Sequence, residues 1–307
     1  MSRPSIAILG LPYFGRMLSG LLSERGWAAT FYPHPGRDLR GWAKLAPALL
    51  RADIVYLIGS RIEKGSPQDR MLQLRRKPVA IHWVGTDVLI ASEEHARGRV
   101  SGRVATKPAH WCDAPWLVDE LRAIGVRSSY LPLPIPLAAV EAPPLPDQFR
   151  VLLYLPVDAF DREVFDIEAL LRLPPEFPEI PFTLIPSPAE TLPGPLPPNL
   201  EARGWVTYMD ALYRTITVVV RLTSHDGMSF MVAESLARER YAIWTFPLEG
   251  AIQSKGFEEV SAALRELLRQ HRSGELRPNH AGRDYVLRHF DRDTLLTGLD
   301  NALRALL

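Results

Sequence analysis

Short apolar runs alternate along the first part of the chain with longer segments in which apolar residues recur every three or four positions. Runs such as residues 6–9, 54–58 and 79–84 have the length and continuity of strands buried on both faces of a parallel sheet. Residues 14–25 place their leucines on one helical stripe, which Gly26 ends. This rhythm predicts a parallel sheet with right-handed crossovers. Further strands are expected at 29–32, 109–112 and 130–135, and helices at 39–51, 68–76 and 116–124.

The same rhythm restarts after a stretch with prolines at 132, 134, 136, 143, 144 and 146, a composition typical of a semi-rigid linker. The pattern therefore predicts an α/β fold of two doubly wound, Rossmann-like domains facing each other across a cleft. We expect an N-terminal domain over 1–138, a linker over 139–148 and a second domain over 149–284. Its strands are expected at 151–155, 182–185, 217–221 and 242–246, and its helices at 164–173, 209–214, 229–238 and 258–270, with a last helix at 293–307.

Composition narrows the class of protein. The chain has 307 residues, 36 basic and 35 acidic, and a formal charge of +1, which argues against wrapping nucleic acid. A single cysteine, Cys112, excludes an internal disulfide and a cysteine-cluster zinc site, and we expect it to be a buried apolar residue. Because no apolar run reaches the ~18 residues of a membrane span and the N-terminus lacks a signal-peptide core, we expect a cytoplasmic protein.

The first strand ends in a glycine-containing loop. Gly10 and Gly15 have the spacing of the outer glycines in a dinucleotide-binding turn, but the middle glycine is replaced by Pro12, which has no N–H group to donate. The second strand ends in Tyr-Pro-His instead of the acid that binds ribose hydroxyls. The sequence therefore does not predict a nicotinamide cofactor. We expect the loop to line a substrate site through Gly10, Tyr13, Phe14 and Gly15.

The most informative segment, residues 221–237, passes from a strand end through a polar turn into an amphipathic helix. Gly227 allows the turn, and either Asp226 or Ser229 can cap the helix. The free N–H groups of the first helical turn and the positive end of the dipole make an anion site suited to a diphosphate. Glu234 lies about two turns further, where a carboxylate suits the vicinal diol of a ribose.

Asp226, Gly227 and Glu234 stand at a spacing that resembles the Glu-x7-Glu signature of retaining GT-B glycosyltransferases, in particular the family-four-like group. Where the family reads Glu-Gly-Phe-Gly, this chain has Asp226, Gly227, Met228 and Ser229. The resemblance implies that Glu234 binds the donor ribose, that Asp226 contacts the sugar ring and that the intervening amides lie near the phosphates. It also implies an acceptor side on the N-terminal domain and a closing helix over 285–307 that crosses back toward that domain.

The chain departs from that family at the diphosphate clamp. Residues 154–162 replace the family's Gly-Arg step and its lysine, so only Arg162 is left to supply a cation, and Pro-Ser-Pro at 186–188 replaces a Gly-x-Gly loop. We therefore expect a degenerate clamp in which the helix dipole and arginines take the electrostatic role, with no metal ion. The expected donor-binding residues are Arg162, Arg221, Thr223, His225, Gly227, Met228, Ser229 and Glu234.

The fourth strand of the first domain ends in a second polar motif. His82 is predicted either as a hydrogen-bond donor or base near the sugar or as a structural histidine. Asp87 is predicted either to orient an acceptor hydroxyl or to cap the next helix, and Gly85 and Thr86 are assigned to the acceptor side. The predicted catalytic residues are thus His82, Asp87 and Asp226. A basic cluster of Arg97, Arg99, Arg103 and Lys107 is interpreted either as a contact for anionic lipid or phosphate or as a solvated loop.

These features favour a metal-independent glycosyltransferase that moves a hexosyl or related group from a nucleotide-diphosphate sugar to an unknown acceptor, with retention implied by the resemblance. The acceptor is left open among saccharide, lipid and small molecule, as is peripheral contact with the inner face of a membrane. No cofactor beyond the nucleotide-sugar co-substrate and no nucleic-acid partner are expected. The alternatives are a non-catalytic relative that binds nucleotide or a partner protein, and a nucleotide-sugar epimerase.

Overall fold

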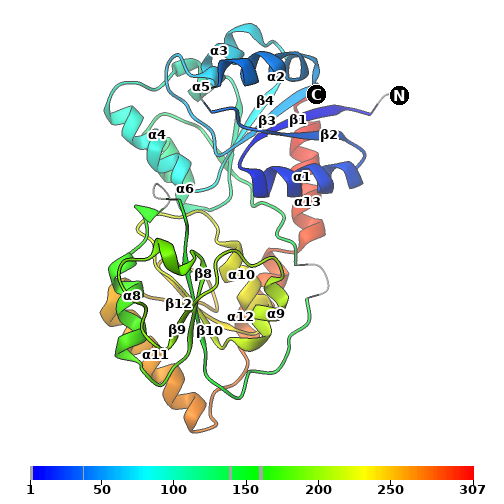
Figure 1. Cartoon of the computed structure of the whole chain (residues 1–307). Coiled ribbons are helices and arrows are strands. Elements are labelled where there is room, and N and C mark those ends of the chain that lie inside the picture. Colours follow the sequence, from blue (N-terminus) through cyan, green and yellow to red (C-terminus); the bar gives the residue numbers. More distant parts are fainter. Residues whose placement is uncertain (1–2, 37, 138–139, 159–161) are drawn as a thin grey trace. The chain divides into compact units, whose positions relative to one another are not determined.

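The computed structural model describes residues 3–36, 38–137, 140–158 and 162–307. The chain forms two compact units (Figure 1). Unit 1 contains residues 1–134 and 292–307, and unit 2 contains residues 135–291. The predicted domain boundary at 138 and the first linker residue, 139, lie outside the described residues. Within the described part of the chain, no helix is long and apolar enough to cross a membrane.

Unit 1 is built on a six-stranded parallel sheet in the order β2-β1-β3-β4-β5-β6. The central strands are the continuous apolar runs: every residue of β3 and β4 is buried, as expected when helices cover both faces of a sheet. Ile8 of β1 pairs with Phe31 of β2 and Tyr56 of β3. The strands are β1 (Ser5–Gly10), β2 (Ala28–Pro33), β3 (Ile54–Ile58), β4 (Val79–Trp83), β5 (Ala109–Cys112) and β6 (Ser129–Tyr130).

Helices of unit 1 begin where the sequence supplies caps. Pro12 opens the first helix, the Asp38 side chain accepts a hydrogen bond from the Arg40 amide at the second, and Ser66 caps the third. The first helix buries Leu18, Leu21 and Leu22, the predicted apolar stripe. The helices are α1 (Pro12–Glu24), α2 (Leu39–Arg51), α3 (Pro67–Leu74), α4 (Thr86–Ala96), α5 (Gly102–Thr106), α6 (Trp116–Ala123) and α13 (Arg292–Arg304).

Unit 2 contains a second six-stranded parallel sheet, in the order β12-β11-β10-β7-β8-β9. Successive residues of its central strand point to opposite faces. Val151 and Leu153 pack in one apolar cluster, and Leu152 packs in another. The strands are β7 (Val151–Leu155), β8 (Phe182–Pro186), β9 (Leu200–Ala202), β10 (Val218–Arg221), β11 (Tyr241–Trp244) and β12 (Ile252–Gln253).

Helices cover both faces of this sheet. Leu170 and Leu264, from the eighth and eleventh helices, share the cluster of Val151, whereas Leu212 and Met231, from the ninth and tenth, share the cluster of Leu152. The helices are α8 (Ile167–Glu176), α9 (Met209–Thr215), α10 (Phe230–Ala237), α11 (Gly256–Arg272) and α12 (His280–His289), with a 3-10 turn, η1 (Ala189–Thr191).

The end of the chain differs from the single closing helix over 285–307 that the family resemblance implied, whereas the helix predicted from the pattern at 293–307 corresponds to α13. The structure has two helices there, α12 and α13, separated at Phe290 and Asp291. Helix α12 belongs to unit 2 and α13 to unit 1. Within unit 1, α13 is anchored by the Trp27 indole, whose Nε1 donates a hydrogen bond of 2.6 Å to Asp300 Oδ1.

Both sheets have a topological switch point. In unit 1 the chain places β2 on one side of β1 and β3 on the other, so the switch lies between β1 and β3. In unit 2 it places β8 and β9 on one side of β7 and β10 to β12 on the other, so the switch lies between β7 and β10. Ligands of open α/β sheets bind outside the carboxyl ends of strands at such points. The loops after β7 and β10 therefore define the candidate site of unit 2.

Candidate functional site

The turn after β10 leads directly into α10. Ser229 is the residue that caps this helix, since its Oγ accepts a hydrogen bond of 3.4 Å from the Val232 amide. Of the two caps that the sequence left open, Asp226 is engaged elsewhere. Within the described residues, the amides of Gly227 and Met228 donate no hydrogen bond to the protein. The start of α10 thus combines unsatisfied N–H groups with the positive end of a helix dipole, which together favour an anion.

Asp226 is the centre of a buried hydrogen-bond network. Its carboxylate accepts bonds from Arg221 Nε (2.6 Å) and Nη2 (2.9 Å), from Trp244 Nε1 (3.2 Å) and from Thr223 Oγ1 (3.3 Å). The residue is 8% exposed. In this position the carboxylate holds the turn against β10 and β11. Its hydrogen bonds fix the loop, and its predicted contact with a donor sugar stays a prediction.

Arg221 is held on two sides. The Asp226 carboxylate is its ion-pair partner. The guanidinium carbon of Arg221 lies 4.8 Å from the ring centroid of Tyr154 and 5.0 Å from that of Phe165. Burial lowers the pKa of Arg221, but the charge and hydrogen bonds of Asp226 outweigh this and raise it. A bidentate ion pair between aromatic rings is a rigid arrangement. Arg221 was predicted to bind the donor diphosphate, and the structure shows its Nε and Nη2 groups already engaged by Asp226.

Arg162, the other predicted cation of the clamp, is used to join loops. Its Nε donates to Pro156 O (2.6 Å), its Nη1 to Thr191 O (2.9 Å), and its Nη2 to Ser187 Oγ (2.7 Å) and Thr191 Oγ1 (2.9 Å). Since a guanidinium has only five N–H donors, little is left for a ligand. Arg162 therefore fastens the loops after β7 and β8 to each other. Residues 159–161, which precede it, lie outside the described residues.

Glu234 is the one predicted site residue with an oriented and partly available carboxylate. The Tyr213 hydroxyl donates a bond of 2.8 Å to its Oε2, while Oε1 accepts no hydrogen bond within the described residues. Burial raises the pKa of Glu234, against the opposing effects of the Tyr213 hydrogen bond and the Arg238 charge. The residue is half-buried. Glu234 is thus held in one orientation with an oxygen free to accept.

Sequence reasoning missed the partners that position Glu234. Tyr213 comes from α9, and the Arg238 guanidinium carbon lies 4.7 Å from the centroid of its ring. Arg238 is in turn ion-paired with Asp210. Arg238 Nη1 also donates to the backbone oxygen of Glu234 (2.8 Å). The Leu-Tyr step at 212–213 is plain in the sequence, but its spacing alone does not show that the hydroxyl reaches across to α10.

The remaining predicted donor residues lie in the same turn. Thr223 is buried, and its amide donates to Thr245 Oγ1 (3.1 Å) after β11. His225 is half-buried, whereas Gly227 and Met228 are buried. The structure therefore brings these residues together at the switch point of unit 2, and their contacts with a donor remain predictions.

In unit 1, the two glycines of the predicted substrate loop lie at the end of β1 and inside α1, where neighbouring atoms leave no room for a side chain. Gly10 has a φ of 138°, and a Cβ atom there would lie 1.8 Å from the carbonyl oxygen of Ile58. A Cβ at Gly15 would lie 2.2 Å from the Phe31 ring. Tyr13, by contrast, is 50% exposed at the switch point. Its ring centroid lies 5.4 Å from that of the half-buried Phe14. The acceptor role predicted for Gly10, Tyr13, Phe14 and Gly15 stays a prediction.

His82 lies inside the sheet of unit 1. It is fully buried in β4, its Nδ1 lies 2.6 Å from the Tyr56 hydroxyl, and its ring packs beside Trp111. Burial lowers the pKa of His82 to about 3, so the ring is neutral at physiological pH. Of the two roles that the sequence left open, this placement favours the structural histidine.

Asp87 lies in the first turn of α4, whose N-cap residue is Gly85. Its carboxylate accepts hydrogen bonds from the amides of Val84 (3.0 Å) and Val88 (3.1 Å), and it is buried. Burial raises its pKa to about 7 even though these hydrogen bonds act in the opposite direction. Gly85, with a φ of 121°, and half-buried Thr86 complete the turn. The structure thus shows Asp87 bonded to backbone amides at the start of α4, while the acceptor role of this motif stays a prediction.

The three arginines of the basic cluster that follows α4 are ion-paired. Arg97 and Arg99 pair with Glu94 (2.8 Å and 2.5 Å), and Arg103 pairs with Asp69 (3.0 Å). Lys107 Nζ lies 3.4 Å from the Leu72 carbonyl oxygen. Contact of this cluster with anionic lipid or phosphate stays a prediction. Cys112 is buried, as predicted, and burial raises the pKa of its thiol to about 12.

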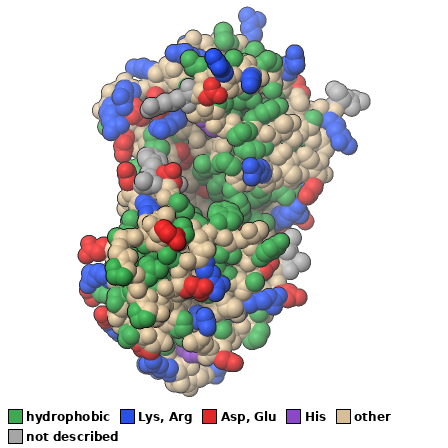
Figure 2. Space-filling view, in the orientation of Figure 1, with side chains coloured by type: hydrophobic (Ala, Val, Ile, Leu, Met, Phe, Trp, Pro, Cys, Tyr) green, Lys and Arg blue, Asp and Glu red, His purple; other side chains and the backbone are tan. Residues whose placement is uncertain are grey.

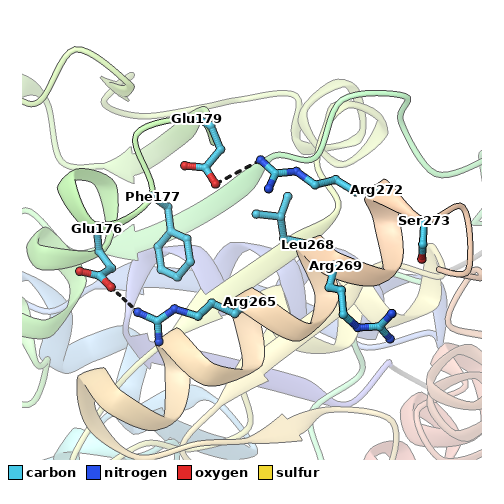
Figure 3. Close-up of a pocket in the computed structure, with 8 residues that line it drawn as sticks. All are labelled: Glu176, Phe177, Glu179, Arg265, Leu268, Arg269, Arg272 and Ser273. Atoms are coloured by element: carbon cyan, nitrogen blue, oxygen red, sulfur yellow. Dashed lines mark hydrogen bonds and ion pairs between the residues drawn. The ribbon is translucent and has the colours of Figure 1, made fainter.

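A groove of about 580 Å³ lies elsewhere in unit 2, between α8 and α11 (Figure 3). Its floor includes the buried Phe177, and two ion pairs cross it, Arg265 with Glu176 and Arg272 with Glu179. A crossover helix runs antiparallel to the strands, so the last turn of α8 lies at the amino edge of the sheet. The groove is therefore remote from the strand ends that position ligands. Within the described residues, no cluster of three or more His, Cys, Asp or Glu residues is arranged to hold a metal ion.

Comparison with solved structures defines the fold class. Sucrose-phosphate synthase from Thermosynechococcus elongatus superposes with a TM-score of 0.77 at 12% identity, covering 99% of each chain. HepE from Anabaena, in complex with UDP-glucose, has a TM-score of 0.71 at 10% identity over 98% of this chain and 99% of its own. A glycosyltransferase from Rickettsia africae has a TM-score of 0.69 at 8% identity over 100% and 99% of the chains. The chain therefore has the GT-B fold, as predicted. No protein-family profile and no curated protein matches the chain.

Proposed function

We propose that the chain is a glycosyltransferase that binds a nucleotide-diphosphate sugar at the carboxyl edge of the unit 2 sheet and transfers the sugar to an acceptor. One observation carries the proposal. Tyr213 orients Glu234 with Oε1 free, about one turn into a helix that Ser229 caps, at the switch point between β7 and β10. This is the arrangement of donors and acceptor that a ribose and a diphosphate require together.

The diphosphate is bound by backbone groups in this proposal. Arg162 and Arg221 are engaged by the protein, so the amides of Gly227 and Met228 and the dipole of α10 supply the positive potential. These groups are fixed before the donor arrives, because the Asp226 network holds the turn. Preorganised dipoles of this kind stabilise the charge that develops on a departing diphosphate. None of these residues calls for a metal ion.

The ribose is bound by Glu234. A carboxylate accepts hydrogen bonds only, which suits the two hydroxyl donors of a vicinal diol. Because Tyr213 and the packing around it restrict the rotamers of Glu234, little side-chain entropy is lost on binding. The complex of HepE with UDP-glucose supports a UDP-sugar as the donor in a chain of this fold.

The acceptor is proposed to be a saccharide bound by unit 1 near Tyr13, at the switch point between β1 and β3. A second HepE structure holds UDP together with glucose, and this supports a saccharide in such a fold. Retention of the anomeric configuration and transfer of a hexosyl group follow from the resemblance of the Asp226–Glu234 segment to retaining enzymes.

A product assay tests the proposal. The protein is incubated with UDP-glucose, UDP-N-acetylglucosamine, GDP-mannose and dTDP-glucose, each with and without a panel of mono- and disaccharides, in buffer containing EDTA. We expect release of nucleoside diphosphate that an acceptor accelerates, and a product whose anomeric configuration, read by NMR, equals that of the donor. Tight binding without release would instead identify a non-catalytic relative, and interconversion of the donor sugar would identify an epimerase.

A variant pair ties the activity to the site. Glu234→Gln keeps the shape of the side chain and removes its charge, whereas Glu258→Gln makes the same change at an exposed position on α11 of the same unit. We expect the donor KM to rise about tenfold or more in the first variant, since hydrogen bonds to a charged group contribute ~1.5–3 kcal/mol. The second variant should retain the wild-type KM.

A further inference from the structure

The exposed face of α2 in unit 1 is both apolar and basic. The helix buries Leu45 and Leu49 against the unit and turns the opposite side to solvent. Leu39 and Leu50 at its two ends are 76% and 49% exposed. The exposed positions recur at the 3.6-residue period of a helix, so they lie on one face. They are Leu39, Arg40, Ala43, Lys44, Pro47, Leu50 and Arg51.

Helix α3 and the residues after it extend this face. The Arg75 guanidinium donates to the carbonyl oxygens of Leu49 and Ala52, so the ends of α2 and α3 are tied together. Lys77 Nζ donates to the Arg51 carbonyl oxygen (2.9 Å). Leu74, at the end of α3, is 77% exposed. We call the combined surface the α2–α3 face; it adds Arg70, Leu74, Arg76 and Lys77 to the residues of α2.

Most of the positive charge on the α2–α3 face is not neutralised. Within the described residues, Lys77 pairs with Asp53 (3.0 Å), whereas the other five basic side chains of the face form no ion pair. The acids nearby are otherwise occupied: Asp38 caps α2, and Asp69 is buried and bonded to Ser101 and Arg103. In Figure 2, the end of unit 1 that carries α2 and α3 shows blue and green side chains with little red. The five are Arg40, Lys44, Arg51, Arg70 and Arg76.

This face differs from the basic cluster at 97–107, whose three arginines are ion-paired with Glu93, Glu94 and Asp69. Single exposed leucines are ordinary on protein surfaces. Three of them set among five unpaired basic side chains, on helices that lie along the surface, match the composition of helices that bind at a lipid interface. Clusters of four to eight basic residues of this kind are attracted to anionic headgroups.

We propose that the α2–α3 face docks on an anionic membrane surface, with Leu39, Leu50 and Leu74 entering the headgroup region and the basic side chains contacting lipid phosphates. The occupant is a lipid surface because the face combines apolar and positive groups along two helices, which is complementary to anionic headgroups above acyl chains. The inference does not depend on the proposed transferase activity, since it rests on a different surface from the nucleotide site.

Vesicle co-sedimentation tests this inference on the full chain. Vesicles of phosphatidylcholine alone are compared with vesicles that contain 40% phosphatidylglycerol, at 50 mM and 500 mM NaCl. We expect binding only to the anionic vesicles, and release at high salt because screening shortens the range of the attraction. The double variant Lys44→Glu/Arg76→Glu should lower the partition coefficient at least about 25-fold, at about fivefold per basic residue removed.

A matched control separates a specific face from net charge. The double variant Lys255→Glu/Arg288→Glu makes the same change in charge at exposed positions of unit 2 and should bind as wild type does. Equal loss in both variants, absence of binding to anionic vesicles, or binding to neutral vesicles as strong as to anionic ones would each overturn the inference. UDP-glucose binding, measured without vesicles, should be the same in both variants, so failure of the nucleotide site and failure of the membrane face are read separately.

Discussion

Removal of the Asp226 carboxylate is the perturbation that separates a structural role from a substrate contact. In Asp226→Ala, the Arg221 guanidinium loses both of its carboxylate bonds, and the donors Trp244 Nε1 and Thr223 Oγ1 lose an acceptor. The side chains of the pair are only 14% and 11% exposed, so water does not readily replace the lost partner. Leaving such a charge unpaired costs ~3–5 kcal/mol.

The free energy of unfolding of the protein, measured by urea denaturation, is the readout. We expect Asp226→Ala to lose ~3–5 kcal/mol. The double variant Arg221→Met/Asp226→Ala should lose less than the single one, because it removes the unpaired charge and keeps an apolar side chain between Tyr154 and Phe165. A double variant less stable than Asp226→Ala would contradict this explanation.

An exposed pair provides the control. Arg122 Nη1 lies 2.5 Å from Asp119 Oδ1, but the two side chains are 69% and 77% exposed. Pairs of this kind contribute at most ~1 kcal/mol. Asp119→Ala should therefore leave stability nearly unchanged. If Asp226→Ala cost no more than Asp119→Ala, the carboxylate would not hold the turn, and its structural role would be refuted.

Single contacts elsewhere in the chain give three more expected outcomes. Tyr213→Phe removes the hydroxyl that orients Glu234. The donor KM should rise about fivefold, because a lost hydrogen bond costs ~1 kcal/mol. An unchanged KM would contradict the positioning role. Arg162→Met removes four hydrogen bonds from the loops of unit 2. The free energy of unfolding, measured by urea denaturation, should fall by ~2–4 kcal/mol. A loss below ~1 kcal/mol would show that these bonds do not hold the loops. Burial lowers the pKa of His82 to about 3 in the folded protein, against an ordinary value of 6.5. The contribution of neutral His82 to the free energy of unfolding is therefore complete above pH 6.5 and decreases progressively as the pH falls toward 3. At pH 5 this contribution has fallen by ~2 kcal/mol. In His82→Gln the free energy of unfolding should depend less on pH in this acid range. An unchanged pH dependence would contradict the explanation.

The sheets were predictable because their signals are local. Buried runs such as 54–58 and 79–83 are continuous apolar segments, and Ser229 is a cap that any helix start of this kind favours. The shortest strands were not predicted: β9 and β12 have three and two residues, too few to show a period. The break between α12 and α13 was missed as well, because no proline or glycine marks residues 290–291.

The candidate site was predictable only in part. The Asp226–Glu234 spacing located the turn and the helix, since both lie within one segment of the chain. The commitment of Arg162 to Ser187 and Thr191 was not predictable, because those partners are 25 and 29 residues away along the chain. The same holds for Tyr213, which reaches Glu234 across 21 residues. Side-chain pairing between elements decides which charges face a ligand, and a linear pattern does not record it.

Calorimetric titration with UDP-glucose is the sharpest test of whether Glu234 Oε1 and the start of α10 hold a nucleotide-diphosphate sugar. We predict saturable binding at one site per chain by the wild-type protein and by Glu258→Gln, with affinity lowered about tenfold or more in Glu234→Gln, on the ~1.5–3 kcal/mol of a charged hydrogen bond. Saturable binding with the same affinity in Glu234→Gln would contradict this assignment.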